Sequence, residues 1–184
     1  MTIDFGGVNF PFPYREPDKV YVGFTAVFSG CWRAMNGNPC PDCQNPSLWG
    51  NLDWNGDTYE WIEEYVRKKC ALLTDVELFY CVLGGEPLDQ DAKELETVHR
   101  RVMTACGRQI PTVLYTGYDE APKPVAGYVE QYVDYLKTGA YLGDKYKVKG
   151  LSTGLATKNQ KWARNTNASR TLFFLGQSKQ SFGK

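Results

Sequence analysis

Short apolar runs and segments with helical spacing alternate through the first three quarters of the chain. The apolar runs are rich in β-branched and aromatic residues, which predicts strands at residues 21–28, 76–83, 112–115 and 133–137. Apolar residues three or four positions apart predict helices at residues 58–70, 91–106 and about 125–131. This alternation predicts an α/β fold with a parallel sheet and right-handed crossovers.

The periodicity weakens after Lys137. Residues 149–170 are rich in small, polar and basic residues, so we expect loops around one short strand there. Residues from about 177 to 184 are expected to form a disordered tail. The chain of 184 residues is long enough to bury one core, so residues 1–184 are expected to form a single domain.

Acidic and basic side chains balance, with 21 of each, so no long-range field draws the chain to nucleic acid or to an anionic membrane. No run of 18 apolar residues occurs, and the first residues lack a basic stretch followed by an apolar one. We therefore expect a cytoplasmic protein that binds neither nucleic acid nor membrane. Its partners are expected to be small molecules or one specific protein surface.

Three of the six cysteines, Cys31, Cys40 and Cys43, lie close together directly after the first predicted strand. In a reducing cytosol, such a group favours metal ligation over disulfides. Structural zinc sites are closed by four ligands, whereas three thiolates leave a position open for a substrate or cofactor. Thiolates select zinc, copper(I) or iron-sulfur clusters, and the lack of a second Cys-x2-Cys pair favours a cluster over zinc. The remaining cysteines are expected to pack in the core: Cys70, Cys81 and Cys106.

Parallel strands end at one edge of a sheet, and active sites form at that edge. The segments expected there are the cysteine loop, residues 84–87, residues 116–117 and Asp134. The chemically rich residues should therefore converge on one site. His99, the only histidine, lies among charged residues of a predicted helix and is expected at the surface.

Two motifs are similar to those of the radical S-adenosylmethionine superfamily, which carries Cys-x3-Cys-x2-Cys after its first strand and Gly-Gly-Glu-Pro after its second. Here Cys31, Cys40 and Cys43 follow the first predicted strand, and Gly-Gly-Glu-Pro at residues 84–87 follows the second. Within that superfamily the chain most resembles the anaerobic ribonucleoside-triphosphate reductase activating proteins. The similar segments are residues 28–31, 40–49, 115–118, 133–139 and 159–160, and the resemblance spans about residues 21–164.

The resemblance implies a partial (β/α) barrel with its active site at the strand C-terminal ends. It also implies that Cys31, Cys40 and Cys43 bind a 4Fe-4S cluster whose fourth iron is chelated by S-adenosylmethionine. One electron from the cluster would cleave that cofactor to methionine and a 5′-deoxyadenosyl radical, which removes a hydrogen from a glycine of a partner protein. The implied partners are the large subunit of anaerobic ribonucleotide reductase and an electron donor such as flavodoxin. No catalytic residue beyond the cluster is implied.

Cofactor-binding roles carry over to both motifs. Gly84 and Gly85 would let the backbone approach the methionine moiety closely. Glu86, or backbone oxygens beside it, would accept hydrogen bonds from the methionine ammonium. Asp42 and Gln44, on either side of the third cysteine, would line the adenosine through their backbone.

Two later residues complete the implied cofactor site. Thr116 and Asp134, expected at strand ends, would hydrogen-bond the ribose or the methionine. From the residues alone, a turn for Thr116 and a cap or a solvated charge for Asp134 are equally open.

Two features depart from the family pattern. Eight residues separate Cys31 from Cys40 where the family has three, and the five-residue insertion contains Gly and Asn, so it is flexible enough to bulge. Asp42 stands where many superfamily members carry an aromatic residue that packs on adenine.

Two other functions remain open. A small-molecule radical enzyme such as 7-carboxy-7-deazaguanine synthase would use the same cofactors on a different substrate. A noncatalytic zinc-binding interaction module would use the three loop cysteines and one distant thiol such as Cys70.

Overall fold

The computed structural model describes residues 2–7, 20–43, 45–50, 57–73, 75–143, 155, 157–166 and 171–175. Outside the described residues lie the predicted tail, Gln44, and residues 149–154, 156 and 167–170 of the predicted loop region.

The described residues form seven strands, four α-helices and two short 3-10 helices. The strands are β1 (Thr2–Gly7), β2 (Tyr21–Phe28), β3 (Glu77–Gly84), β4 (Thr112–Tyr115), β5 (Tyr135–Thr138), β6 (Lys161–Thr166) and β7 (Thr171–Leu175). The helices are α1 (Trp32–Met35), η1 (Pro46–Leu48), α2 (Tyr59–Leu72), η2 (Pro87–Asp89), α3 (Ala92–Cys106) and α4 (Lys123–Tyr132). The predicted strands and helices are confirmed, including the one short strand expected between residues 149 and 170.

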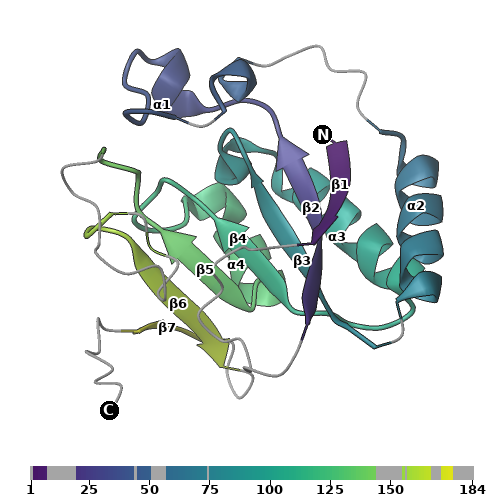
Figure 1. The fold of residues 1–184 in the computed structure, drawn as a ribbon. Coiled ribbons are helices and arrows are strands. Elements are labelled where there is room, and N and C mark those ends of the chain that lie inside the picture. Colours follow the sequence, from purple (N-terminus) through teal and green to yellow (C-terminus); the bar gives the residue numbers. More distant parts are fainter. Residues whose placement is uncertain are drawn as a thin grey trace.

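All seven strands belong to one sheet in consecutive order from β1 to β7 (Figure 1). The middle strands β2, β3, β4 and β5 are parallel to one another. β1 pairs antiparallel with β2, β6 pairs antiparallel with β5, and β7 pairs antiparallel with β6. The predicted α/β fold is therefore confirmed, with a parallel centre and antiparallel strands at both edges.

Local signals fix the ends of the two longest helices. The Thr58 hydroxyl accepts a hydrogen bond from the Trp61 N–H at 3.2 Å and caps α2. The Asp91 carboxylate accepts from two N–H groups of the first turn of α3, at 2.9 and 3.1 Å. α3 ends at Gly107, which has a φ of 71° that glycine adopts without strain. These caps determine where α2 and α3 begin and where α3 ends before the chain continues to the next strand.

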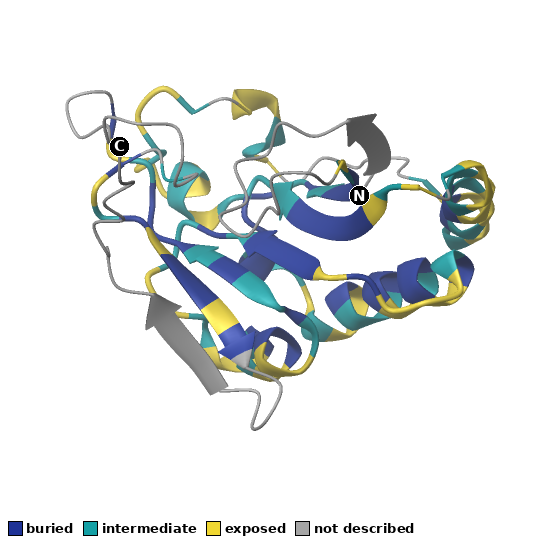
Figure 2. Cartoon of the chain, turned by 60° about the horizontal axis from the view of Figure 1, so that its bottom comes forward, coloured by how far each residue is buried: buried dark blue, intermediate teal, exposed yellow. Residues whose placement is uncertain are grey.

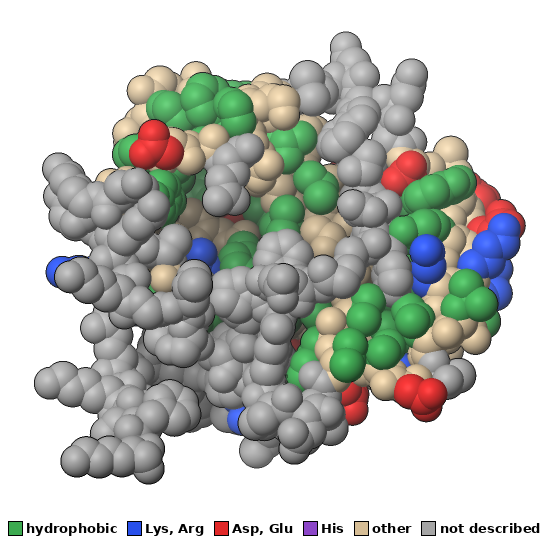
Figure 3. Space-filling model, viewed as in Figure 1, with side chains coloured by type: hydrophobic (Ala, Val, Ile, Leu, Met, Phe, Trp, Pro, Cys, Tyr) green, Lys and Arg blue, Asp and Glu red, His purple; other side chains and the backbone are tan. Residues whose placement is uncertain are grey.

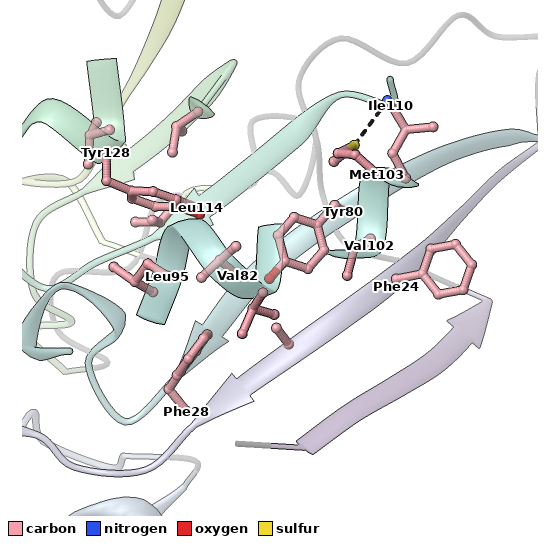
Figure 4. Packing of buried hydrophobic residues seen from close by; sticks show 14 of the residues in the cluster. Phe24, Phe28, Tyr80, Val82, Leu95, Val102, Met103, Ile110, Leu114 and Tyr128 are labelled. Atoms are coloured by element: carbon pink, nitrogen blue, oxygen red, sulfur yellow. Dashed lines mark hydrogen bonds between the residues drawn. The ribbon is translucent and has the colours of Figure 1, made fainter. Parts of the chain in front are cut away.

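The long helices α2, α3 and α4 all pack against one face of the sheet. Alternate strand residues face the same way, and those on this face form a single buried cluster with the helices (Figure 4). The strand members include Phe24, Phe28, Tyr80, Val82 and Leu114, and the helix members include Ile62, Val66, Leu95, Val98, Val102, Val125 and Val129. Figure 2 shows this buried layer between the strands and the inner sides of the helices.

The opposite face of the sheet carries a smaller cluster formed by Phe79, Cys81, Val113 and Trp162. Among the described residues, no helix residue belongs to it. Cys81 is fully buried, which confirms its predicted place in the core. The parallel sheet therefore has one face covered by helices and one face with a small apolar centre of its own.

His99 was predicted at the surface, and this prediction was wrong. It is only 5% exposed and its ring lies edge-on to the Tyr80 ring, with centroids 5.7 Å apart. The helical period explains the error, because His99 lies four residues after Leu95 and so shares its buried face. Within the described ranges, every helix is too short or too polar to cross a bilayer.

Candidate functional site

The candidate site lies at the sheet edge where the parallel strands end. The cysteine loop with α1 follows β2 directly and lies beyond the arrowhead of β2 in Figure 1. The loops after β3 and β4 reach the same edge. Five predicted site residues lie at or just after these strand ends: Cys31, Gly84, Gly85, Glu86 and Thr116.

Backbone hydrogen bonds join the Gly-Gly-Glu segment to the start of the cysteine loop. The Gly85 N–H donates to the Phe28 carbonyl at 2.8 Å, and the Glu86 N–H donates to the Gly30 carbonyl at 2.7 Å. These bonds continue the pairing of β2 with β3 beyond the ends of both strands. The residue before Cys31 is thereby held against Glu86.

Neither glycine of this segment has room for a side chain. A Cβ on Gly84 would lie 2.2 Å from the Phe28 carbonyl oxygen, and the φ of Gly84 is +134°. A Cβ on Gly85 would lie 2.3 Å from the Gly30 oxygen and 2.7 Å from the Leu48 oxygen. Contact between segments of the chain itself therefore requires both glycines. This requirement is separate from the cofactor role that the resemblance implies.

The Glu86 side chain is 3% exposed and bridges the ends of β3 and β4. Its Oε1 accepts from the Thr116 hydroxyl at 2.7 Å and from the Leu88 N–H at 3.1 Å. Its Oε2 accepts from the Gly117 N–H at 2.7 Å. Both oxygens of this carboxylate are thus engaged by the chain, and so is the Thr116 hydroxyl.

Burial raises the pKa of Glu86 to about 7, because the charged form loses its hydration. The Thr116 hydroxyl and the N–H groups of Gly117 and Leu88 oppose this rise by favouring the ionised form. The nearby carboxylate of Asp89 adds to the rise. Glu86 therefore takes up and releases a proton near neutral pH.

Asp89 is a residue of this site that sequence reasoning missed. One carboxylate oxygen accepts from the backbone N–H of Trp32, the first residue of α1. The other oxygen accepts from the Tyr118 hydroxyl at 2.6 Å. Burial and this hydrogen bond both raise the pKa of Tyr118. Asp89 thus joins the cysteine loop to the loop after β4. In the sequence, only its position three residues after Glu86 indicated that it could belong to the site.

The Cys31 thiol is partly buried among carboxylates. Burial raises its pKa most, and the charges of Glu86 and Asp89 raise it further. The N–H groups of Ala34 and Arg33 lower it. A metal ion would reverse the balance, because ligation to a cation removes the thiol proton.

The two other cysteines have different neighbours. The Trp49 indole N–H donates to the Cys43 sulfur at 3.3 Å, and the Trp49 carbonyl accepts from the Cys31 N–H at 3.0 Å. Cys40 lies near Lys137, a partly buried residue of β5 that sequence reasoning also missed. Burial lowers the pKa of Lys137 to about 8, and the charge of Cys40 opposes this change. The sequence did not indicate a role for Lys137, because its neighbours come from segments distant in sequence.

The donor set suits a soft metal centre. All three loop cysteines are partly exposed, free thiols on one loop at the strand ends, and thiolates prefer iron-sulfur clusters or zinc. Across the described ranges, however, no three Cys, His, Asp or Glu side chains lie close enough together to hold one metal ion. The chemistry of the ligands therefore fits, and the thiols would have to be drawn together when a metal binds.

Asp42 lies in a turn between Cys40 and Cys43 and its side chain is exposed. Its φ of 51° is in the left-handed region, which Asp adopts more readily than most residues. This turn lies beside Gly143, at whose position a Cβ would be 3.4 Å from the Pro41 side chain.

Asp134 was predicted at the same edge as Glu86, and this prediction was wrong. It precedes β5 and so lies at the start of the parallel strands. Its Oδ2 accepts from the N–H of Thr112, the first residue of β4, at 2.7 Å. The predicted strand 133–137 already had Asp134 near its start, so only the resemblance supported placing this residue at the site. A hollow of about 690 Å³ opens at this opposite edge, and its lining includes Arg100 and Asp134.

Cys70 also lies at the opposite edge. It occupies the last turn of α2, shortly before β3 begins at Glu77, and Glu77 pairs with Tyr21 at the start of β2. The cysteine loop follows the far end of β2, which at about 3.3 Å per residue is roughly 25 Å away. Cys70 therefore cannot complete a zinc site with the loop cysteines, and the zinc-binding alternative would need a different fourth ligand.

Compared with protein-family models, curated proteins and solved structures, the chain matches none of them.

Proposed function

We propose that the chain is an iron-sulfur radical S-adenosylmethionine enzyme that generates a glycyl radical on anaerobic ribonucleoside-triphosphate reductase. The observation that carries this proposal is the 2.7 Å hydrogen bond from the Glu86 N–H to the Gly30 carbonyl. It joins the cysteine motif to the Gly-Gly-Glu-Pro motif, which are distant in sequence. The resemblance depends on this combination, and the parallel pairing of β2 with β3 brings the two motifs into contact.

Two features of the fold support a partial (β/α) barrel. The strand order is consecutive, as it is in a barrel. α2, α3 and α4 contribute to one cluster on one face, whereas a doubly wound sheet has helices on both faces. The face with Phe79, Cys81 and Lys137 would then be the inner face of the barrel, with the candidate site at its mouth.

Cys31, Cys40 and Cys43 are the proposed ligands of a 4Fe-4S cluster. When bound, the cluster would supply the electron that cleaves S-adenosylmethionine to methionine and a 5′-deoxyadenosyl radical. The loop would hold the three thiolates and leave the fourth iron accessible to the cofactor. The Trp49 indole would donate to the Cys43 sulfur, and such bonds help to set the reduction potential of a cluster.

The geometry refines the cofactor-binding roles. Because both Glu86 oxygens already accept hydrogen bonds from the chain, the backbone at Gly84 and Gly85 would contact the methionine moiety, and Glu86 would hold this segment in place. Thr116 would act through Glu86. Asp42 would line the adenosine through its backbone, as the resemblance implies.

A protein substrate is supported by apolar side chains beside the site. Trp32 and Met35 on α1 are 56% and 51% exposed, and Figure 3 shows apolar side chains gathered over this part of the molecule. Both lie between Cys31 and Cys40, in the loop that carries the insertion. We propose that the large subunit of the reductase docks here, and that an electron donor such as flavodoxin reduces the cluster.

Anaerobic reconstitution with ferrous iron and sulfide tests the metal centre. We expect about four iron ions per chain and the charge-transfer absorbance of a cluster. Cys40→Ala should lose the cluster, whereas Cys70→Ala, which changes a thiol at the far edge, should retain it. A colourless protein loaded with zinc would overturn the proposal.

Substrate identity is tested after chemical reduction of the cluster in the presence of S-adenosylmethionine. We expect 5′-deoxyadenosine, and with the reductase added we expect the electron paramagnetic resonance signal of a glycyl radical. Trp32→Ala should lower the glycyl radical yield and leave 5′-deoxyadenosine formation without the reductase unchanged. Formation of 5′-deoxyadenosine without any glycyl radical would favour the small-molecule alternative.

A further inference from the structure

Two cysteines outside the candidate site lie in direct contact. Cys70 is in the last turn of α2 and Cys106 is the last residue of α3. Their sulfur atoms are 3.0 Å apart, although the two residues are 36 positions apart in sequence. An S–S bond is about 2.05 Å long, so a further approach of about 1 Å would join them.

The two helices hold this pair together. Both run in the same direction as successive crossovers and pack against the same face of the sheet. One to two turns before the cysteines, Arg101 of α3 forms a 2.7 Å ion pair with Glu63 of α2 and also lies 4.5 Å from the centre of the Tyr59 ring. These contacts fix how the helices align. The final approach needs only movement of the helix ends, where Gly107 already leaves the helical conformation.

The two thiols are accessible but not equivalent. Both are partly exposed, unlike the fully buried Cys81. The Cys70 thiol donates its hydrogen bond to the Cys106 sulfur. Burial, followed by this contact, raises the pKa of Cys70 to about 12, while Arg108 opposes the rise. Cys70 therefore holds its proton more tightly than an ordinary thiol, which leaves Cys106 to react first with a disulfide.

We propose that Cys70 and Cys106 form a reversible disulfide that links the C-terminal ends of α2 and α3. The co-reactant is a small-molecule disulfide such as oxidised glutathione. This redox site lies at the edge of the sheet away from the loop cysteines, and it does not depend on the radical chemistry proposed for them.

The reaction proceeds by thiol-disulfide exchange. Cys106 loses its proton and its sulfur attacks one sulfur of the small disulfide, which breaks the S–S bond, forms a mixed disulfide and releases the other half as a thiolate. Cys70 then loses its proton and attacks the Cys106 sulfur, which releases the second half. The chain loses two hydrogen atoms in total, and its two electrons reduce the small disulfide to two thiols.

Oxidised glutathione added anaerobically to the full chain, followed by alkylation and trypsin digestion, tests the pairing. We expect a disulfide-linked pair of peptides, residues 70–93 and 102–108, which dithiothreitol separates. The link closes a loop of several tens of residues, so the unfolding equilibrium constant should fall on the order of a hundredfold. The midpoint of thermal unfolding should rise accordingly and return to its original value after reduction.

Single variants identify the sulfurs and their order of attack. Peptide 70–93 also contains Cys81, so Cys81→Ser should keep the link and Cys70→Ser should abolish it. In Cys70→Ser, Cys106 should carry a stable glutathione adduct, whereas in Cys106→Ser, Cys70 should remain largely free. If both thiols stay open to alkylation while the loop cysteines react with glutathione, the proposal is overturned. A link that survives in Cys70→Ser but is lost in Cys81→Ser would also overturn it.

Discussion

The buried carboxylate of Glu86 accepts a 2.7 Å hydrogen bond from the hydroxyl of Thr116. Glu86 follows β3 and Thr116 follows β4, so this contact joins the ends of two adjacent parallel strands. The backbone of Glu86 is bonded at the same time to the segment after β2. One residue therefore organises three of the loops that form the candidate site, and its protonation state bears on their stability.

Glu86 should make the protein less stable as pH rises from about 4.5 to about 7. Its pKa is about 7 in the native state, above the ordinary value of 4.5, so the native state binds more protons than the unfolded state in this window. The favourable contribution is complete below pH 4.5 and is lost as pH rises through 7. The shift corresponds to about 3 kcal/mol. In urea unfolding, the stability of wild type relative to Glu86→Gln should fall by about this amount across the window.

A matched control separates this effect from the loss of a charge. Glu94→Gln removes an exposed carboxylate from the first turn of α3. Its unfolding curve should follow that of the wild-type protein as pH changes. If Glu86→Gln also runs parallel to wild type over the whole range, Glu86 does not titrate as we infer.

Gly85→Ala should destabilise the fold by about 2–4 kcal/mol, because the new Cβ would lie 2.3 Å from the Gly30 oxygen and neither backbone segment can move freely. Gly127→Ala is the matched control, since nothing lies within 4 Å of its Cβ position inside α4. That substitution should stabilise the protein by about 0.5–1 kcal/mol, because alanine favours helix. Chemical unfolding measures both changes, and equal effects at the two positions would contradict the packing argument.

The sequence predicted the parallel strands and their crossover helices because their signals are local. The spacing of apolar residues can be recognised within one segment. Capping residues such as Thr58 and Asp91 bond to N–H groups only two or three residues away. β1 lacked such a signal, because its sequence ends in Gly6 and Gly7 and its strand form depends on pairing with β2. A local sequence pattern cannot predict a strand that forms only by pairing with another strand.

The sequence predicted which motifs form the candidate site. It did not predict the contacts between the loops that carry them. The spacing of the cysteines and of Gly84-Gly85-Glu86 could be read directly, and the parallel topology brought them to one edge. The roles of Asp89 and Lys137 could not be predicted from the sequence. Each depends on a neighbour from a loop distant in sequence, Tyr118 for Asp89 and Cys40 for Lys137. The glycines were predicted to serve a cofactor, whereas close contact within the chain already requires them.

Asp134→Ala should affect stability and leave cofactor binding intact. Removing its carboxylate deprives the Thr112 N–H of an acceptor, which costs about 1–3 kcal/mol. Because Asp134 lies at the start of the strands, iron content and affinity for S-adenosylmethionine should match those of wild type. Both are measured on reconstituted protein, the affinity by calorimetry. A folded Asp134→Ala protein with normal iron content that no longer binds the cofactor would contradict the placement of the site.

Asp89→Ala should release α1 without unfolding the sheet. The Trp32 N–H would lose its carboxylate acceptor and the Tyr118 hydroxyl would lose its partner, so the loop that carries Cys31 would open more often. Hydrogen exchange at the Trp32 amide, followed by nuclear magnetic resonance, should accelerate by roughly 10-fold to 100-fold, as expected for the loss of one charged hydrogen bond. Tyr118→Phe keeps the bond to Trp32 and should give a much smaller change. Amides within β3 should exchange at wild-type rates in both variants, and acceleration there in step with Trp32 would instead indicate global destabilisation.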